Sequence, residues 1–283
     1  MRHPETPTRS AMRFLLPLGV LLCAGTALAA SPGPAPLHLF TQVAVSPDGV
    51  HVATLEADQP ADENAQPAFG IVIRPVSGGG AAVAVGLPCR GADCAPSSLA
   101  WSPDGHHLAF VLKRPNQALR DVMQVGADGM GATRLLSFDG TLQGLRYGPD
   151  GTLAVLATAG AHKEPGATQA AAKLAGEIGA SEDEQRIATI ANNTLQFRSP
   201  ADLYVYEYDW QPDPAATGHI RFVGTAAHGN GDNNWWIAKL YGFDNNTARL
   251  LYTPPQRQQL ADPVVSPDGR TLAFIGGIMS DFG

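Results

Sequence analysis

The chain of 283 residues lacks the motifs that identify most enzyme active sites. It contains no G-x-S-x-G nucleophile elbow, no P-loop, no dinucleotide-binding glycine fingerprint and no H-E-x-x-H zinc motif. Its eight histidines are scattered without the spacing of metal ligands. These residues therefore encode no α/β-hydrolase nucleophile, no Walker-type nucleotide site and no thermolysin-type zinc centre. We expect neither a cofactor nor a metal, and whether the chain is an enzyme is left open.

Basic residues are also scarce. The chain has 19 lysine and arginine residues against 26 aspartate and glutamate residues, which gives a net charge of −7. A surface of this sign argues against nucleic acid or an anionic membrane as a partner, because both are bound through clustered positive charge. The hydrophobic content of 44% is ample for a buried core.

The main hydrophobic run near the N-terminus, about 16 residues long, is shorter than the roughly 20 needed to span a bilayer. Arg9 and Arg13 precede this run, and Ala27-Leu28-Ala29 follows it as a small-x-small cleavage site. The pattern predicts a signal peptide over residues 1–29, cleaved near Ala29, followed by a linker over 30–38. An uncleaved anchor is the alternative. We expect a periplasmic or secreted protein without stable membrane insertion after cleavage.

Cysteine is rare, with three residues in the chain. Cys23 lies within the predicted signal peptide, which leaves Cys89 and Cys94. In an oxidising compartment these two cysteines are close enough in sequence for a local disulfide. Free thiols are the alternative, and a metal site would need two further ligands that nothing nearby supplies.

What the chain does contain is a tight turn built on Pro-Asp that recurs five times. Proline presets φ at the second position of a type I turn, serine suits the first position and glycine the last. The turn prolines are separated by 56, 46, 63 and 55 residues. A recurring unit of this size indicates a repeat architecture. The copies are Ser46-Pro47-Asp48-Gly49, Ser102-Pro103-Asp104-Gly105, Gly148-Pro149-Asp150-Gly151, Gln211-Pro212-Asp213 and Ser266-Pro267-Asp268-Gly269.

Short β-branched or aromatic runs flank each turn and predict strands on both sides of it. Four strands in each unit of about 45 to 60 residues are typical of a β-propeller blade. We therefore predict an all-β fold, an incomplete β-propeller over residues 39–283 with about four and a half four-stranded blades. The predicted blades span 39–87, 97–138, 142–198, 203–253 and, as a half blade, 260–283.

The third unit is interrupted by a long insertion over residues 158–185. Its segment Gln169–Ile178 is rich in strong helix formers, which predicts one short helical insertion. Glu182, Asp183 and Glu184 follow that segment. They are candidates for an acidic patch that binds a substrate ammonium group, and a solvated loop is the simpler interpretation.

The most unusual polar stretch lies in the fourth unit. Asn230, Asp232 and Asn234 alternate as oxygen ligands do in a calcium loop, but the glycine and the bidentate glutamate of that loop are missing. A blade loop is the simplest interpretation, and a contact with a central pocket or a partner domain is the alternative. The run Trp235–Tyr241 that follows is predicted to be a strand.

The repeats resemble the Pro-Asp-containing propeller repeats of TolB and of the prolyl oligopeptidase family. Three longer stretches, Ser199–Trp210, Asn233–Ala238 and Phe274–Gly283, are similar to the propeller of exported bacterial dipeptidyl and acylaminoacyl peptidases. The resemblance implies a substrate-gating propeller that caps a C-terminal α/β-hydrolase domain with a serine nucleophile. No catalytic residue can be carried over, because that domain is not encoded in these residues.

Two functions follow from the resemblance as expectations. The first is the N-terminal, substrate-gating propeller portion of an exported serine peptidase, which reaches its peptide substrate together with a missing hydrolase domain and is inactive alone. The second is a stand-alone periplasmic propeller of the TolB type that binds a protein partner. A weaker possibility is that four blades close by themselves, with the last hairpin completing the first blade.

Overall fold

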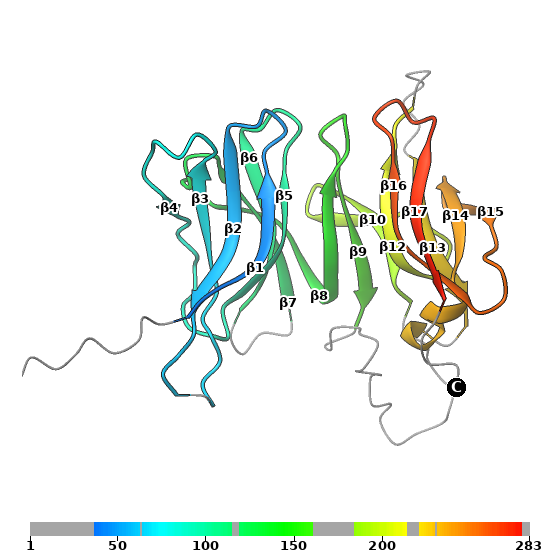
Figure 1. The fold of residues 1–283 in the computed structure, drawn as a ribbon, viewed down its shortest axis with the longest axis horizontal. Coiled ribbons are helices and arrows are strands. Elements are labelled where there is room, and N and C mark those ends of the chain that lie inside the picture. The colour runs from blue at the N-terminus through cyan, green and yellow to red at the C-terminus, as the bar shows by residue number, and fades with distance from the viewer. Residues whose placement is uncertain are drawn as a thin grey trace, which may run out of the picture. The chain divides into compact units, whose positions relative to one another are not determined.

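The computed structural model describes residues 37–278 apart from 63, 115–118, 161–183, 214–220 and 230, and apart from the side chains of 231–233. The chain divides into two compact units, Met1–Ala35 and Pro36–Gly283. The predicted signal peptide falls in the first unit and the predicted helix in the insertion of the second, so both lie outside the described residues. Within the second unit the described chain is built from antiparallel strands and one short 3-10 helix (Figure 1).

The first sheet is a four-stranded antiparallel meander. Its strands are β1 (His38–Val45), β2 (His51–Asp58), β3 (Gly70–Pro75) and β4 (Val83–Ala84), which pair in that order. The first Pro-Asp turn joins β1 to β2. The outermost strand, β4, has two residues and pairs only with Val72 and Ile73 of β3.

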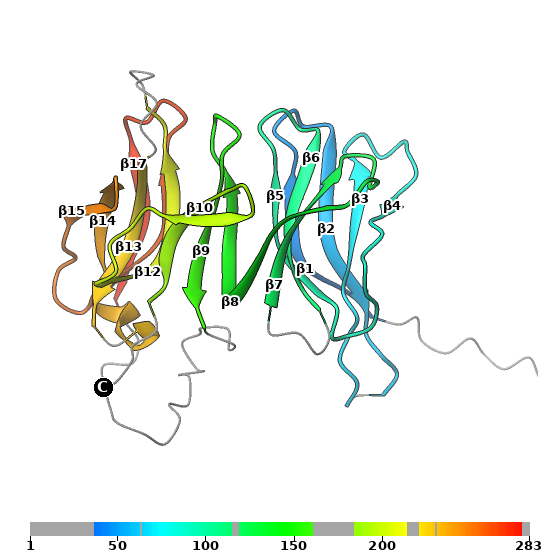
Figure 2. The same ribbon diagram turned by 180° about the vertical axis from the view of Figure 1, so that it is seen from behind.

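The second sheet has seven strands because one strand serves two units. Its strands, in order, are β5 (Ala95–Trp101), β6 (His107–Lys113), β7 (Leu119–Gly126), β8 (Thr133–Tyr147), β9 (Leu153–Ala159), β10 (Arg186–Ala191) and β11 (Thr194–Phe197). The first half of β8 pairs with β7 and the second half pairs with β9 (Figure 2). The sequence predicts two separate units here, and the structure joins them through one continuous strand.

Gly140 marks the point at which β8 passes from one unit to the next. Its φ of 145° is in the region that favours glycine, and a Cβ atom there would lie 2.1 Å from the carbonyl oxygen of Thr158. Strand β8 changes its partner from β7 to β9 here without a turn, so no turn-forming residues are required. The sequence therefore gives no signal for the end of one strand and the start of another.

The remaining strands form a four-stranded sheet and a two-stranded sheet. The four-stranded sheet contains β12 (Leu203–Gln211), β13 (Arg221–His228), β14 (Lys239–Asp244) and β15 (Thr247–Tyr252), and the two-stranded sheet contains β16 (Gln258–Val265) and β17 (Leu272–Ile278). The 3-10 helix η1 (Gly231–Ile237) lies between β13 and β14. The prediction of a strand over Trp235–Tyr241 was therefore wrong in its first half, since β14 begins at Lys239.

We call each set of four successive strands a blade. Blade 1 is β1–β4, blade 2 is β5–β7 with the first half of β8, blade 3 is the second half of β8 with β9–β11, and blade 4 is β12–β15. The strands β16 and β17 form a half-blade. The inner strand of each blade is the strand that enters its Pro-Asp turn, namely β1, β5, the second half of β8, β12 and β16.

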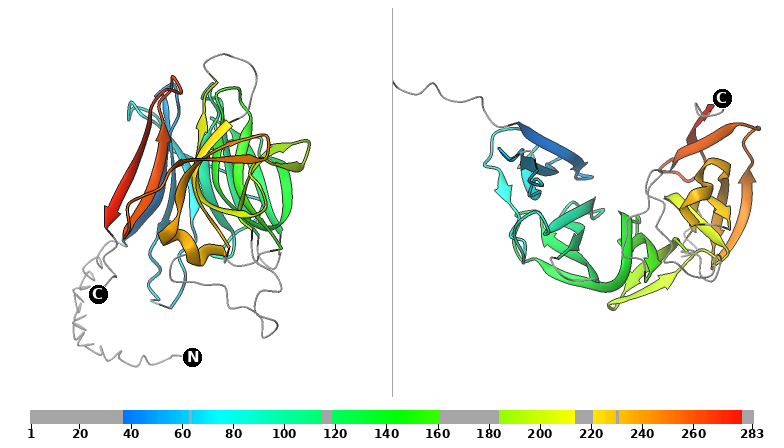
Figure 3. Two further views of the ribbon diagram at one scale, coloured as in Figure 1. Left: turned by 90° about the vertical axis from the view of Figure 1, so that its right-hand side faces the viewer. Right: turned by 90° about the horizontal axis from the view of Figure 1, so that it is seen from below.

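Four apolar clusters lie between successive blades. Phe110 of β6 is fully buried in the cluster shared by blades 1 and 2, and Val155 of β9 lies in the cluster shared by blades 2 and 3. Phe222 of β13 is fully buried between blades 3 and 4, and Leu260 of β16 packs on blade 4. Each buried phenylalanine contributes about 2–3 kcal/mol by leaving water. Seen from below in Figure 3, each sheet lies beside the next in chain order.

Candidate functional site

The Pro-Asp turns are held by one repeated set of hydrogen bonds. In the first turn the Ser46 hydroxyl donates to Asp48 Oδ1 at 2.5 Å, and the amide of Val50 donates to the same oxygen at 3.0 Å. The turns at Asp104 and Asp268 repeat both bonds. These donors stabilise the charged form, so they lower the pKa of all three carboxyl groups, the serine hydroxyl having the largest effect. The turns are therefore rigid ends for the inner strands.

Two tryptophans, each two residues before a turn proline, form hydrogen bonds to the neighbouring inner strand. Trp101 Nε1 donates to the carbonyl oxygen of Ala44 at 3.0 Å, across the interface of blades 1 and 2. Trp210 Nε1 donates in the same way to the carbonyl oxygen of Arg146 at 3.3 Å, across the interface of blades 3 and 4. Both acceptors stand three residues before the turn proline of the preceding blade. Each tryptophan thus fixes the position of its inner strand along the neighbouring inner strand.

The inner strands of all four blades and the half-blade line one cavity of about 790 Å³. Four turn prolines and the two interface tryptophans contribute to its wall, so much of the lining is rigid and apolar. The remaining lining comes from residues of the inner strands close to the turns. These include Gln42, Ser98, Leu99, Gly144, Leu145, Arg146, Tyr147, Asp209 and Val265. The cavity therefore lies along the inner strands, and every blade and the half-blade contribute to its lining.

Arg146 and Asp209 are the charged side chains in this lining. Arg146 Nη1 lies 3.6 Å from Asp209 Oδ1, and half of the arginine side chain is exposed. Its guanidinium group also lies 5.9 Å from the centre of the Tyr208 ring. The other carboxylate oxygen of Asp209 accepts a hydrogen bond from the amide of Val265 at 2.8 Å. The pair therefore links three inner strands and leaves the arginine accessible.

Glu207 is a half-buried carboxyl group on the inner strand of blade 4. Its Oε2 accepts hydrogen bonds from the amide of Asp262 at 2.9 Å and from the Thr225 hydroxyl at 3.3 Å. Burial raises the pKa of Glu207 above its ordinary value, and the amide of Asp262 opposes that shift. This carboxyl group connects blade 4 to the half-blade.

A second cavity of about 700 Å³ lies between blades 2 and 3 at the end that carries the turns. The carboxylates of Asp104 and Asp150 and the phenol of Tyr147 line it. Burial, helped by the negative charge of Asp104, raises the pKa of Tyr147 to about 12. Arg198, also in the lining, donates to Thr189 Oγ1 at 2.9 Å. The lining combines apolar residues with polar groups, and Asp104, Asp150 and Arg198 each form hydrogen bonds within the chain.

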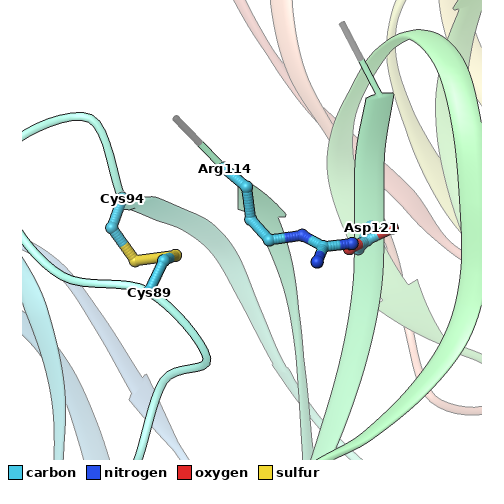
Figure 4. The surroundings of a disulfide bond; sticks show 4 residues. All are labelled: Cys89, Cys94, Arg114 and Asp121. Carbon is cyan, nitrogen blue, oxygen red and sulfur yellow. A yellow bond between two sulfur atoms is a disulfide. The ribbon is translucent and has the colours of Figure 1, made fainter. Parts of the chain in front are cut away.

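Cys89 and Cys94 are joined by a disulfide bond in the segment between β4 and β5. Their Cα atoms are 5.6 Å apart, and Cys94 packs in the apolar cluster between blades 1 and 2. Figure 4 shows the ion pair of Arg114 and Asp121 beside this bond. Asp121 is buried on β7, and Arg114 follows β6. The disulfide fixes the crossing of the chain from blade 1 to blade 2.

Of the other predicted site residues, Glu184 and Asn234 line neither of these two cavities. Glu182, Asp183 and Asn230 lie outside the described residues, and the side chain of Asp232, in η1, does as well. Glu184 is exposed. Asn234 Nδ2 donates to the carbonyl oxygen of His228 at 3.0 Å, which ties η1 to the end of β13. For Asn234 the structure thus shows a structural role within blade 4.

The strands that lead into both predicted loops end on the same side of their blades. The insertion follows β9 and the Asn-rich stretch follows β13, and each of these strands leads away from a Pro-Asp turn. Both loops therefore begin at the end opposite the turns. Among the described residues, no group of three His, Cys, Asp or Glu side chains is arranged to hold a metal ion. The described part of the chain contains no helix long and apolar enough to cross a membrane.

The polar residues of the cavity, and Glu207 near it on β12, were not predicted from the sequence. Gln42 and Glu207 stand five residues before a turn proline, and Arg146 and Asp209 stand three residues before one. Aligning the five units on their turn prolines would have shown a polar side chain five residues before the proline in four units. The position three residues before it is polar only in the third and fourth units.

No family model matches the chain, and no curated protein matches it significantly. Solved structures do match. The acylaminoacyl peptidase of Pyrococcus horikoshii matches over 85% of this chain and 38% of its own, with 12% identity and a TM-score of 0.53. A puromycin-hydrolyzing peptidase of Mycobacterium tuberculosis matches over 80% of this chain and 33% of its own, with 16% identity and a TM-score of 0.52. TolB of Acinetobacter baumannii matches over 86% of this chain and 55% of its own, with 14% identity and a TM-score of 0.48.

At this level of identity the two peptidase matches show the fold. Together with the sheets described above, they confirm the predicted all-β, incomplete propeller with four blades and a half-blade. The neighbours are TolB and the propeller regions of peptidases of the prolyl oligopeptidase and acylaminoacyl peptidase type. The chain spans between a third and about half of the length of the three neighbours described above.

Proposed function

We propose that these residues are the propeller portion of an exported peptidase of the prolyl oligopeptidase family. In this proposal the propeller admits extended peptides into the cavity between its inner strands and excludes folded proteins. The nucleophile belongs to a hydrolase domain that these residues do not encode. The predicted signal peptide supports export to the periplasm or beyond.

The observation that carries the proposal is the cavity of about 790 Å³. Its lining comes from all five inner strands, so a ligand there lies against the inner strands and not on an outer edge. Turn prolines and the interface tryptophans Trp101 and Trp210 make the lining stiff. In this proposal the stiff lining accepts an extended peptide that can adapt to it and rejects a folded domain that cannot.

The chemistry of the lining suits a peptide. Apolar prolines and tryptophans can contact side chains of any sequence, whereas Arg146 and Asp209 provide one charge of each sign for the termini. The resemblance of the repeats and of the stretch Ser199–Trp210 to exported peptidases supports the same class of ligand. The propeller fold alone would also be compatible with a protein-binding module.

The test is a binding assay with a length and folding series. A fluorescein-labelled nonapeptide should bind the purified chain, and the unlabelled nonapeptide should displace it. The same sequence displayed in a loop of a small folded protein should not displace it. Equal displacement by the folded display would contradict gating and would favour a surface-binding module of the TolB type.

A second assay addresses the nucleophile. The chain should not hydrolyse aminoacyl or dipeptidyl p-nitroanilides. Turnover that is blocked by a serine-directed phosphonate would show a nucleophile within these residues and would overturn this part of the proposal. Peptide binding without turnover is the expected combination.

A further inference from the structure

The interfaces between successive blades reuse the same positions. We call the face of a sheet that packs on the next blade its forward face, and the opposite face its backward face. On the second strand of blades 1 to 3 the forward face carries alanine and, two residues later, leucine or valine. All six side chains are buried, and they are Ala53 and Leu55, Ala109 and Val111, and Ala154 and Leu156.

The backward faces use two positions of the inner strand, four and two residues before the turn proline. In blades 2 and 4 these positions hold large side chains that are buried in the cluster shared with the preceding blade. They are Leu99 and Trp101 in blade 2, and Tyr208 and Trp210 in blade 4.

Hydrogen bonds show how the two kinds of face meet. Trp101 donates to the carbonyl oxygen of Ala44, and Trp210 donates to that of Arg146. In both cases the residue two before the turn proline lies beside the residue three before the turn proline of the preceding blade. Each of these interfaces therefore joins a forward face to a backward face in the same register.

The half-blade has a forward face that no described residue covers. On β17 the forward positions hold Ala273 and Ile275, the same pattern of alanine and a branched side chain that blades 1 to 3 bury. Val264 of β16 pairs with Ala273 and shares this face. Ile275 is 60% exposed and Val264 is 51% exposed. The residues of a blade interface are present here without a blade against them.

Blade 1 has the opposite face uncovered. Val43 and Val45 stand four and two residues before Pro47, in the positions at which blades 2 and 4 bury large side chains, yet they are 60% and 58% exposed. Phe40, on the same face, is exposed as well. The chain thus leaves one face of each kind uncovered. Since both faces are exposed, they do not cover each other within one copy.

One charged side chain lies on the backward face of blade 1. Glu56 stands nine residues after its turn proline, where blade 2 has the buried Leu112. Its two carboxylate oxygens accept hydrogen bonds from the guanidinium group of Arg74, each at 2.7 Å, and the Thr54 hydroxyl donates to Oε2 at 2.8 Å. The carboxylate is therefore satisfied within blade 1, and covering it leaves no unpaired charge.

We propose that the backward face of blade 1 packs on the forward face of the half-blade in a second copy of the chain. A second copy presents the face that each uncovered sheet lacks, in the chemistry of the interfaces within the chain. The contact is head-to-tail, so two copies can form it twice. The register of Trp101 on Ala44 places Val45 of one copy beside Val264 of the other. This inference does not depend on the proposed peptide ligand.

Analytical ultracentrifugation measures the association. The purified chain should sediment as an assembly of two or more copies at about 50 μM and should dissociate on dilution. A chain that stays monomeric at that concentration would overturn the proposal.

Charged substitutions test which faces meet. Val43→Asp and Ile275→Asp should each weaken the association at least about tenfold, because each buries a carboxylate without a partner. Met130→Asp is the matched control, since Met130 is 68% exposed in the turn between β7 and β8, away from both faces. The control should associate like the parent chain, and an equal loss in all three variants would overturn the assignment of the faces. Unchanged circular dichroism of the variants shows that they are folded.

Mixing the two variants distinguishes a head-to-tail contact from a contact between like faces. Val43→Asp keeps its forward face and Ile275→Asp keeps its backward face, so an equimolar mixture should form a complex of two chains. Neither variant should form that complex alone. Association of Val43→Asp alone as tightly as the parent would show that two forward faces meet, and a mixture that stays monomeric would also overturn the proposal.

Cysteine cross-linking tests the register. A mixture of the Val45→Cys and Val264→Cys variants should form a disulfide-linked pair on oxidation, with the linked peptides identified by mass spectrometry. Val45→Cys mixed with Met130→Cys should not form the corresponding link. Equal yields in the two mixtures would overturn the register, since they would reflect random collisions.

Discussion

Phe110 and Phe274 occupy the same position in two copies of one sequence. Each follows a Ser-Pro-Asp-Gly turn by five residues and is preceded by Leu-Ala. Their surroundings differ, because Phe110 is fully buried between blades 1 and 2, whereas Phe274 of the half-blade is 36% exposed and packs beside the Tyr252 ring. The pair therefore separates the packing of blades from local strand propensity.

Replacing Phe110 by alanine removes a fully buried side chain and leaves a cavity against Met123, its partner on β7. We expect a loss of about 3–5 kcal/mol in the free energy of unfolding. Phe274→Ala should cost about 1–2 kcal/mol, because much of that ring is already in contact with water. With about 2–4 °C per kcal/mol for a chain of this size, the unfolding midpoint should fall by about 6–20 °C for the first variant and by about 2–8 °C for the second.

Guanidinium titration followed by circular dichroism, together with calorimetry, measures both variants against the parent chain. The strand propensity lost is the same at the two sites, so any difference comes from packing between sheets. Equal losses, or a larger loss for Phe274→Ala, would refute the reasoning that blade stacking provides the core.

Three further predictions follow from the contacts between blades. Trp210→Phe should lower the free energy of unfolding by about 1–2 kcal/mol in urea titrations, since the carbonyl oxygen of Arg146 loses its indole donor; an unchanged midpoint would contradict that role. Replacing both Cys89 and Cys94 by alanine should cost roughly 2 kcal/mol, and dithiothreitol should destabilise the parent chain but not the variant; an equal response of both would contradict the contribution of the disulfide. Glu207→Gln should become more stable relative to the parent as the pH rises from about 4 to about 7. The raised pKa of Glu207 means that the folded state binds the proton more tightly than the unfolded state, so the parent loses stability over this range as the carboxyl group ionises. The turn aspartates, whose pKa values are lowered, are present in both proteins, so their effect on stability cancels in the difference. A stability advantage of the variant that does not change with pH, or that grows on acidification, would contradict a raised pKa of Glu207.

The turns and inner strands could be predicted because their signals are local. Proline, aspartate and glycine at fixed positions define the turn, and short apolar runs on both sides define the strands. The prediction of a strand over Trp235–Tyr241 was wrong in its first half. Aromatic residues favour strands, but the structure forms the 3-10 helix η1 as far as Ile237. The continuity of β8 through Gly140 had no sequence signal, because a strand can change partners without a turn.

The polar groups of the cavity could not be predicted as a site. Gln42, Arg146 and Asp209 are single polar residues on three different strands, separated by 104 and 63 positions in the sequence. Only the stacking of blades brings their strands around one cavity. Glu184 and Asn234 were candidate site residues because each lies in a cluster of polar residues in the sequence. Clustering of that kind is typical of loops, whether or not they bind a ligand.

The claim that an extended peptide occupies the space between the inner strands is tested most directly by photo-cross-linking. A nonapeptide with a central benzoylphenylalanine is irradiated with the chain, and the attached residues are identified by mass spectrometry. The account predicts adducts within residues 98–101, 144–147 and 209–210 of the inner strands. Adducts confined to the outer strands β4, β11 and β15 would contradict it.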